Sequence, residues 1–329
     1  MKNIIFFLDA QKGASGGGKV IYQYSSYINS LQNYSSSIIH LKKKKIKKIF
    51  DSLNKKFKRK AKNYSGWKLT DLEVKKNHSF PWFNIKINTK NNLIFDSKKD
   101  FVVLPEIFAH FAEDLLIKKN IPYAIFVQNG YAIFPTNNLD SLNKSYSKAK
   151  FILSYSKDIS ECVSYAYPKI KKKIINTVCS INVNKFKEKI KKQNLITYMP
   201  RKLRKHSELV ISFMRNNLPK KWKIKAIENL NEKDVYKILN KSKIFLSFSD
   251  LEGLGIPPIE AALTGNKVIG YTGESGKEYW QRPIFTRVYS GDIKNFCKEL
   301  LKDLKLDNFM KISKSQRKRL AKHFSLKKE

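Results

Sequence analysis

The chain has 329 residues, enough for two domains of about 150 residues each rather than one large core. Hydrophobic residues make up 42% of it and aromatic residues 12%, which excludes wholesale disorder. The formal net charge of +39 favours anionic partners, but a coding bias toward Lys, Asn, Ile, Phe and Tyr explains a high lysine content equally well.

The sequence shows no sign of a membrane span or a secreted, disulfide-bonded chain. Its apolar runs are all shorter than the ~18 residues that cross a bilayer. The apolar segment 3–9 is too short for a signal peptide, and Asp9 interrupts it before a cleavage site. The three cysteines are widely separated, which favours neither a disulfide framework nor a zinc site. We therefore expect a cytoplasmic protein.

The first half of the chain predicts an α/β domain. A strand at 3–9, a glycine-rich segment at 13–18, a helix through about Leu31 and a second strand at 36–41 form a βαβ unit in a parallel sheet. The other strands expected in this half are 101–104, 123–127, 151–154 and 173–178. Helices are expected at 107–118 and 158–165.

The second half repeats this alternation after a lysine-rich stretch at 182–194. The expected strands are 195–199, 222–227, 244–249 and 268–271. The expected helices are 207–217, 231–240 and 257–263. We predict two Rossmann-like, doubly wound parallel-sheet domains, residues 1–185 and 186–329, that face each other across a cleft.

The most specific motif follows the strand at 244–249. It reads Glu252-Gly253-Leu254-Gly255-Ile256-Pro257-Pro258-Ile259-Glu260. The glycines allow a sharp turn and close approach of the backbone to a ligand, and the prolines are tolerated where a helix begins. The free N–H groups at that helix start favour a diphosphate.

Two carboxylates flank this turn. Glu252 is expected in the loop and Glu260 in the first helical turn, where each can accept hydrogen bonds from sugar or ribose hydroxyls. The alternative for Glu260 is that an acidic residue near a helix N-terminus merely interacts with the helix dipole.

The segment 252–260 closely resembles the E-x7-E signature of glycosyltransferase family 4, which comprises retaining enzymes of the GT-B fold that use nucleotide-diphosphate sugars. Residues 265–271 resemble the strand that follows in that family. The resemblance implies that Glu252 contacts the donor sugar and Glu260 the ribose hydroxyls. It also implies that the backbone N–H groups of Gly253, Leu254 and Gly255 hold sugar and phosphate.

Basic residues follow the first strand of the second domain, where members of that family place an Arg and then a Lys. Here the sequence reads Pro200-Arg201-Lys202-Leu203-Arg204-Lys205. We expect Arg201 and Lys205, with Lys202 as a substitute, to neutralise the charge that develops on a departing diphosphate. In so lysine-rich a chain, a basic pair by chance is the alternative.

The glycine-rich segment 13–20 nearly matches the P-loop pattern G-x-x-x-x-G-K-[ST]. It ends in Val20 instead of the hydroxyl residue that holds Mg²⁺. The family resemblance gives another role, in which Gly16, Gly17 and Gly18 line the cleft and allow donor phosphates and acceptor to approach.

The resemblance also extends to two segments that follow strands in the first half, Pro105-Glu106 with His110, and residues 128–131. We expect these segments to point into the cleft. For His110, a position on a helix surface is the alternative.

The segment 42–62 is a basic amphipathic stretch. Apolar residues recur in it at three- and four-residue steps between cations, at Ile46, Ile49, Phe50, Leu53 and Phe57. This pattern predicts a helix that contacts an anionic membrane surface or an acidic acceptor. The alternative is that the stripe packs on the first domain. Nucleic acid is an unlikely partner, because no nucleic-acid-binding signature accompanies the charge.

We therefore expect a retaining glycosyltransferase that moves a sugar from a nucleotide-diphosphate donor to a hydroxyl of a glycan or lipid-linked acceptor. Family habits suggest cell-surface polysaccharide or glycolipid synthesis, with peripheral location at the inner face of the plasma membrane. The sequence has no D-x-D motif, so neither a metal nor another cofactor is expected. The alternatives are a non-catalytic GT-B scaffold protein at the membrane surface and a P-loop-like NTPase.

Overall fold

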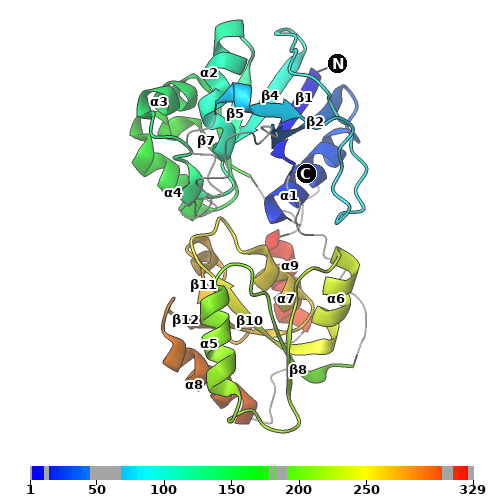
Figure 1. The fold of residues 1–329 in the computed structure, drawn as a ribbon, viewed down its shortest axis with the longest axis vertical. Helices are drawn as coiled ribbons and strands as arrows, with labels where there is room; N and C mark the ends of the chain where they lie inside the picture. Colours follow the sequence, from blue (N-terminus) through cyan, green and yellow to red (C-terminus); the bar gives the residue numbers. More distant parts are fainter. Residues whose placement is uncertain are drawn as a thin grey trace, which may run out of the picture. The chain divides into compact units, whose positions relative to one another are not determined.

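The structure is a computed structural model, and it describes residues 2–10, 15–44, 68–177, 179, 181, 191–305 and 314–324. The chain divides into two compact units. Unit 1 comprises Met1–Ser154 and Ile159–Asn176, and unit 2 comprises Tyr155–Asp158 and Thr177–Glu329. Each unit is an α/β structure with its own sheet and core (Figure 1).

Unit 1 contains a seven-stranded sheet in the order β3-β2-β1-β4-β5-β6-β7. The strands are β1 (Lys2–Asp9), β2 (Tyr34–Lys43), β3 (Leu72–Val74), β4 (Asp100–Pro105), β5 (Tyr123–Phe126), β6 (Ile152–Ser154) and β7 (Ile174–Asn176). The pairings are parallel except at the edge, where β3 runs antiparallel to β2. The predicted parallel sheet is confirmed, and β3 is an addition to it.

The α-helices of unit 1 are α1 (Gly16–Ile28), α2 (Ala112–Leu115), α3 (Leu139–Lys148) and α4 (Lys157–Ala166). The stretch predicted to be helical at 107–118 is helical, but it is not one continuous helix. That segment consists of the 3₁₀ helix η2 (Glu106–Phe111), the short α2 and the 3₁₀ helix η3 (Ile117–Lys119). Phe108 and Phe111 are both buried, and a repeat of three residues per turn places such a pair on one side.

Unit 2 contains a five-stranded parallel sheet in the order β12-β11-β10-β8-β9. Its strands are β8 (Gln193–Tyr198), β9 (Lys223–Ala226), β10 (Ser242–Ser249), β11 (Lys267–Thr272) and β12 (Phe285–Val288). Its helices are α5 (Arg204–Met214), α6 (Glu232–Lys241), α7 (Ile256–Leu263), α8 (Ile293–Lys305), α9 (Lys314–Phe324) and the 3₁₀ helix η7 (Ser275–Glu278).

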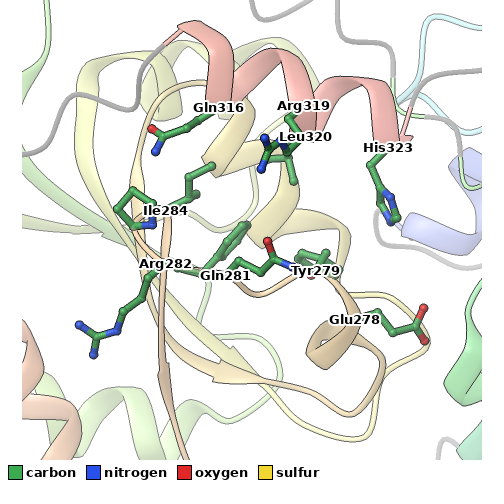
Figure 2. A pocket seen from close by; sticks show the side chains of 11 residues that line it. Glu278, Tyr279, Gln281, Arg282, Ile284, Gln316, Arg319, Leu320 and His323 are labelled. Atoms are coloured by element: carbon green, nitrogen blue, oxygen red, sulfur yellow. The ribbon is translucent and has the colours of Figure 1, made fainter.

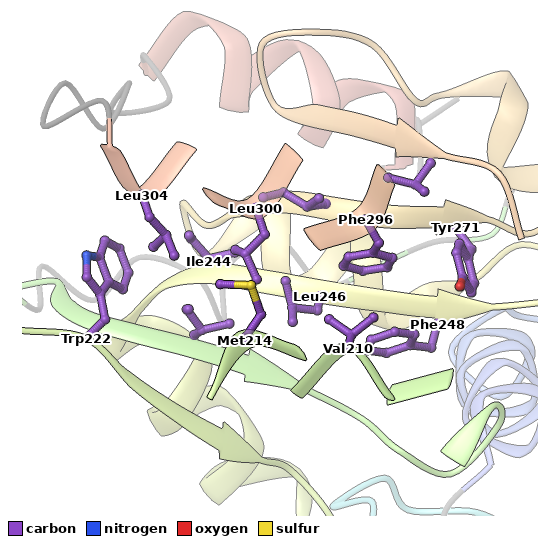
Figure 3. Packing of buried hydrophobic residues seen from close by; sticks show 13 residues of the cluster. Val210, Met214, Trp222, Ile244, Leu246, Phe248, Tyr271, Phe296, Leu300 and Leu304 are labelled. Atoms are coloured by element: carbon purple, nitrogen blue, oxygen red, sulfur yellow. The ribbon is translucent and has the colours of Figure 1, made fainter. Parts of the chain in front are cut away.

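The core of unit 2 lies between the sheet and the helix pair α5 and α8. Figure 3 shows Val210 and Met214 of α5 with Phe296 of α8 against β10. Alternate residues of β10 face this cluster, and the Phe248 ring stacks on Phe296 with 4.9 Å between centroids. This packing fixes where β10 ends, and therefore where the turn after it begins.

Several predictions fall outside the described residues. Of the basic stretch 42–62, only residues 42–44 are described; Lys42 lies in β2, 2.9 Å from Glu73. Most of the predicted linker at 182–194 is also undescribed. None of the helices that the structure describes has the length and apolar character to cross a bilayer.

Candidate functional site

The strand order of unit 2 creates a crevice at the carboxyl ends of two neighbouring strands. β8 and β10 are adjacent and parallel, but their connections leave toward opposite sides of the sheet. In open α/β sheets, ligands bind where the strand order reverses in this way. The turn between β10 and α7 and the segment between β8 and α5 both begin here, and they carry the donor-side residues predicted from the sequence.

The β10–α7 turn, residues 250–255, depends on glycine at two places. Gly255 precedes α7 with a φ of 72°, in the left-handed region that side chains rarely adopt. Gly273, after β11, packs so closely on the turn that a Cβ atom there would lie 2.8 Å from the Asp250 carbonyl oxygen. The turn is thus fixed from within and from the neighbouring strand.

Buried hydroxyls hold three consecutive carbonyl groups of this turn. The Ser156 hydroxyl donates to the Gly253 oxygen at 3.3 Å. The Tyr279 hydroxyl lies 2.9 Å from the Leu254 oxygen and 3.1 Å from the Gly255 oxygen, so that its one proton is shared between them. Tyr279 is buried, and burial raises the pKa of its phenol, which keeps that proton in place.

The same hydrogen bonds determine where the amide groups point. In a planar trans peptide, the N–H points opposite to the C=O of the preceding residue. Because the carbonyls of residues 253–255 face Ser156 and Tyr279, the N–H groups of Leu254, Gly255 and Ile256 face the other way. Among the described residues, none accepts a hydrogen bond from these three groups. The turn presents a short row of donors.

The helix start supplies fewer donors than a helix usually does. Pro257 and Pro258 occupy the second and third positions of α7, so two of the four N–H groups normally free at a helix start are missing. The structure also corrects the position predicted for Glu260. It is the fifth residue of α7 and lies in the second turn, because the helix begins at Ile256, one residue earlier than predicted.

The Glu260 carboxylate is buried and anchored. Glu260 is 8% exposed, and the Tyr236 hydroxyl of α6 donates to its Oε1 at 2.8 Å. Tyr236 thereby restricts the rotation of the carboxylate. A side chain fixed in this way is prepared for a ligand hydroxyl at low entropic cost.

Glu252 forms an ion pair with one of the cations predicted from the sequence. Lys202, in the segment between β8 and α5, places its Nζ 3.3 Å from Glu252 Oε1. Glu252 is 17% exposed and Lys202 is 46% exposed, so the pair is open to ligand on the lysine side. The residue predicted as a substitute is the one that the structure brings to the turn.

The other predicted cations, Arg201 and Lys205, are exposed. Arg201 precedes α5 and Lys205 is its second residue, at the same edge of the sheet. Between them, Arg204 pairs with Glu228 at 2.7 Å. In the described part of the chain, neither Arg201 nor Lys205 forms an ion pair with Glu252 or Glu260.

Sequence reasoning missed the residues that support the turn. Ser156 and Tyr279 lie far from it in the chain and contact it only after folding, as Tyr236 contacts Glu260 of α7. Gly273 and Gly276, which flank Ser275, gave a usable signal of a second turn at this edge. Ser275 donates to Asp158 Oδ2 at 2.9 Å and so holds residues 155–158 beside that turn.

The predicted residues of unit 1 gather at the corresponding edge of its own sheet, after β1 and β4. Gly16, Gly17 and Gly18 form the first turn of α1 instead of a loop, because Ser15 caps that helix by accepting from the Gly18 N–H at 3.3 Å. Gln128 donates to the Gly17 oxygen at 3.1 Å, and a Cβ atom on Gly17 would lie 2.5 Å from Gln128 Oε1. A side chain at Gly17 would therefore have to displace the end of the Gln128 side chain.

Glu106 organises this edge of unit 1. Its carboxylate is buried and accepts from the Gln128 N–H at 3.0 Å and the Asn129 N–H at 3.1 Å. Burial raises the pKa of Glu106 to about 7, although the two amide hydrogen bonds act in the opposite direction. A carboxyl group that changes charge near neutrality thus holds the segment that packs on Gly17.

His110 is half-buried in η2, four residues after Glu106. Its ring packs against Phe111, with 3.8 Å between centroids, and its carbonyl oxygen accepts from the Ser141 hydroxyl of α3 at 3.5 Å. These contacts describe a histidine packed within unit 1, and they place it beside α3.

Comparison with known proteins gives a fold but no sequence family. No protein-family model matches the sequence, and no curated protein matches it. Among solved structures, a mutant of TarM from S. aureus in complex with fondaparinux, α-GlcNAc-glycerol and UDP has a TM-score of 0.65 at 12% identity, over 99% of this chain and 97% of that one.

Two further structures are similar over nearly their whole length. HepE from Anabaena in complex with UDP has a TM-score of 0.66 at 9% identity, over 99% of this chain and 96% of that one. Sucrose-phosphate synthase from Thermosynechococcus elongatus has a TM-score of 0.62 at 10% identity, over 99% and 95%. The chain has two parallel-sheet α/β domains of the GT-B fold, as predicted.

Proposed function

We propose that the chain is a glycosyltransferase that binds a nucleotide-diphosphate sugar at the β10–α7 turn of unit 2. The observation that carries the proposal is the set of outward N–H groups at Leu254, Gly255 and Ile256, beside the carboxylates of Glu252 and Glu260. Amide donors suit phosphate oxygens, and carboxylates suit sugar and ribose hydroxyls. The GT-B fold supports the same function.

The roles of the side chains follow from their surroundings. Glu260, fixed by Tyr236, would accept from the ribose hydroxyls, and Glu252 would accept from the sugar. Lys202, together with Arg201 and Lys205, would offset the charge that develops on the diphosphate as the glycosidic bond breaks.

The reaction that we propose retains the configuration of the anomeric carbon. The bond from that carbon to the phosphate oxygen breaks, and the bond to the acceptor oxygen forms on the same face of the sugar. The proton of the acceptor hydroxyl passes to the departing phosphate oxygen, so the step requires no protein nucleophile. Because the sequence has no D-x-D motif, we propose that the reaction proceeds without a metal ion.

UDP-sugars are the first donors to test, because HepE has been seen with UDP-glucose and TarM with UDP. The TarM complex also contains α-GlcNAc-glycerol, which supports a glycan acceptor as the first class to test. The lysine-rich segment 42–62 supports a lipid-linked or polysaccharide acceptor at an anionic membrane, at its cytoplasmic face.

Calorimetry tests the donor site directly. UDP is expected to bind in EDTA, and Glu260→Ala is expected to weaken UDP affinity by about 10-fold or more, since a hydrogen bond to a charged group is lost. Glu208→Ala is the matched control, because it removes the same charge from an exposed position of α5, outside the turn. An unchanged affinity in Glu260→Ala would remove the ribose assignment, and binding of ATP only with Mg²⁺ would favour an NTPase instead.

Turnover then tests the reaction. Release of UDP from UDP-sugars in EDTA, dependent on a glycan acceptor, is the expected result, and NMR of the product should show the anomeric configuration of the donor. An inverted product would contradict the same-face reaction, whereas dependence on added metal would contradict the metal-free one.

A further inference from the structure

Unit 2 contains a cavity of about 260 Å³ on the far side of Tyr279 from the β10–α7 turn. It lies between α9 and the segment that joins η7 to β12, as Figure 2 shows. This cavity, here called the α9 pocket, is lined by Glu278, Tyr279, Gln281, Arg282, Pro283, Ile284, Phe285, Gln316, Arg319, Leu320 and His323.

The α9 pocket has an apolar floor and a polar rim. Tyr279, Ile284 and Leu320 form the floor, and each is less than 9% exposed. In Figure 2, Arg319 extends from α9 and Gln281 from the opposite segment toward the same space. The pocket therefore offers apolar contact to one part of a ligand and hydrogen-bond donors to another.

The charge around the pocket favours an anion. Of the residues that line the pocket, Arg282 and Arg319 are cationic, and the one acidic residue, Glu278, accepts from the Asp158 N–H at 2.9 Å. Arg282 pairs with Glu299 of α8 at 3.6 Å, and its guanidinium points away in Figure 2. Arg319 differs, because no described residue forms an ion pair or hydrogen bond with its guanidinium.

The geometry points to a binding site for a small free phosphate ester in the α9 pocket, with Arg319 on the phosphate and Tyr279, Ile284 and Leu320 against its apolar part. A guanidinium presents donors in a planar fork that matches phosphate oxygens. The volume lies below the ~300 Å³ typical of sites for drug-sized ligands, so a compact ester is the right size.

Tyr279 links the pocket to the proposed donor site. Its ring forms part of the pocket floor, and its hydroxyl holds the carbonyl groups of Leu254 and Gly255. A ligand that packs on this ring is expected to steady the turn and so to strengthen UDP binding by a few-fold. This coupling rests on the proposed function, whereas phosphate binding in the pocket does not.

Phenyl phosphate is the probe, because it combines a phosphate with an apolar ring. We expect it to bind the whole chain more tightly than inorganic phosphate, and phenol to bind at least 10-fold more weakly, in calorimetric titrations. Arg319→Ala is expected to raise the Kd for phenyl phosphate by about 10-fold. Lys318→Ala removes the same charge from an exposed neighbour outside the lining and should leave the Kd within two-fold.

Three results would overturn the proposal that the α9 pocket binds a phosphate ester. Equal weakening by Arg319→Ala and Lys318→Ala would indicate a general attraction to α9, and equal binding of phenol would indicate an apolar site. Displacement of phenyl phosphate by UDP would place the phosphate at the β10–α7 turn. If UDP itself does not bind, the donor assignment fails, but the comparison of the two α9 variants still tests the pocket.

Discussion

At the scale of single residues, the hydroxyl of Tyr279 has a larger role than its place in the sequence indicates. It is the donor to two consecutive carbonyl groups of the β10–α7 turn, at 2.9 and 3.1 Å. The orientation of the following amides depends on those bonds. A change that removes the hydroxyl and keeps the ring isolates this contribution.

We predict that Tyr279→Phe lowers UDP affinity by about 3- to 10-fold, because the amides of Gly255 and Ile256 lose their fixed direction. Loss of a buried hydrogen bond should also lower the free energy of unfolding by about 1 kcal/mol. Tyr289→Phe is the control, since Tyr289 is 67% exposed. Calorimetry and urea unfolding measure the two effects; equal affinities in both variants would contradict the role given to the hydroxyl.

Single residues also show which parts of the candidate site could be predicted from the sequence. Glu252 and Glu260 were recognisable because they stand in one short motif whose glycines and prolines have local roles. Lys202 was a candidate cation, but its pairing with Glu252 could not be predicted, and neither could the contact of Tyr236 with Glu260, since both pairs meet only through the fold. Spacing in the chain carries no information about contacts of that kind.

At the scale of elements, β11 packs closely on β10 and α8 beside the proposed site. Gly270 has a φ of 135°, and a Cβ atom there would lie 2.2 Å from the backbone oxygen of Ser247 in β10 and 2.8 Å from the Phe296 ring. A side chain at Gly270 would separate β11 from β10 just before the strands reach the crevice.

We predict that Gly270→Ala lowers the free energy of unfolding of unit 2 by about 3 kcal/mol or more, because backbone strain and overlap add. Gly291→Ala is the matched control. Its φ is 87°, but nothing lies within 4 Å of the added atom, so only the strain of about 1 kcal/mol remains. Urea unfolding followed by tryptophan fluorescence measures both, and similar losses in the two variants would contradict the packing argument.

Elements differed in how well the sequence predicted them. The buried strands β1, β4, β5 and β10 were predicted because their apolar runs are continuous. Helix α3 was not, since Leu142 and Tyr146 are its only large buried side chains and give too narrow a stripe. The edge strand β3 has three residues and pairs on one side, so its sequence carries little signal.

At the scale of the whole molecule, buried titratable groups make the stability of unit 1 depend on pH. Unit 1 contains a buried histidine, His40, whose Nε2 lies 3.0 Å from the Tyr22 hydroxyl and whose ring packs on His78. Burial, followed by the charges of His78 and Lys75, lowers the pKa of His40 to about 3. Burial also lowers the pKa of His78.

We predict that His40 lowers the free energy of unfolding of unit 1 as the pH falls below about 6.5, by up to about 1.4 kcal/mol per pH unit. The unfolded chain takes up the proton at pH 6.5, whereas folded His40 resists it down to about pH 3. Glu106, whose pKa is raised to about 7, acts in the opposite direction, because the folded chain binds its proton at a higher pH than the unfolded chain does. Urea unfolding at pH 7.5 and pH 5, compared between the unsubstituted chain and His40→Gln, measures the contribution of His40.

His40→Gln should remove this contribution, so that lowering the pH from 7.5 to 5 costs the variant less stability than the unsubstituted chain, whereas His206→Gln, in unit 2, should behave like the unsubstituted chain. If the change in the free energy of unfolding between pH 7.5 and pH 5 is the same with and without His40, the role given to His40 is wrong.

The two prolines at the start of α7 have a consequence for how firmly a nucleotide would be retained. With Pro257 and Pro258 in place, the start of α7 adds fewer N–H donors to the turn, so solvent-facing cations such as Lys202 are expected to supply a larger share of the attraction for a diphosphate. Dissolved ions screen such attraction over about 8 Å at ~0.15 M ionic strength. The product nucleotide would therefore dissociate readily, and more readily as the salt concentration rises. Fast dissociation suits rapid exchange of product for fresh substrate.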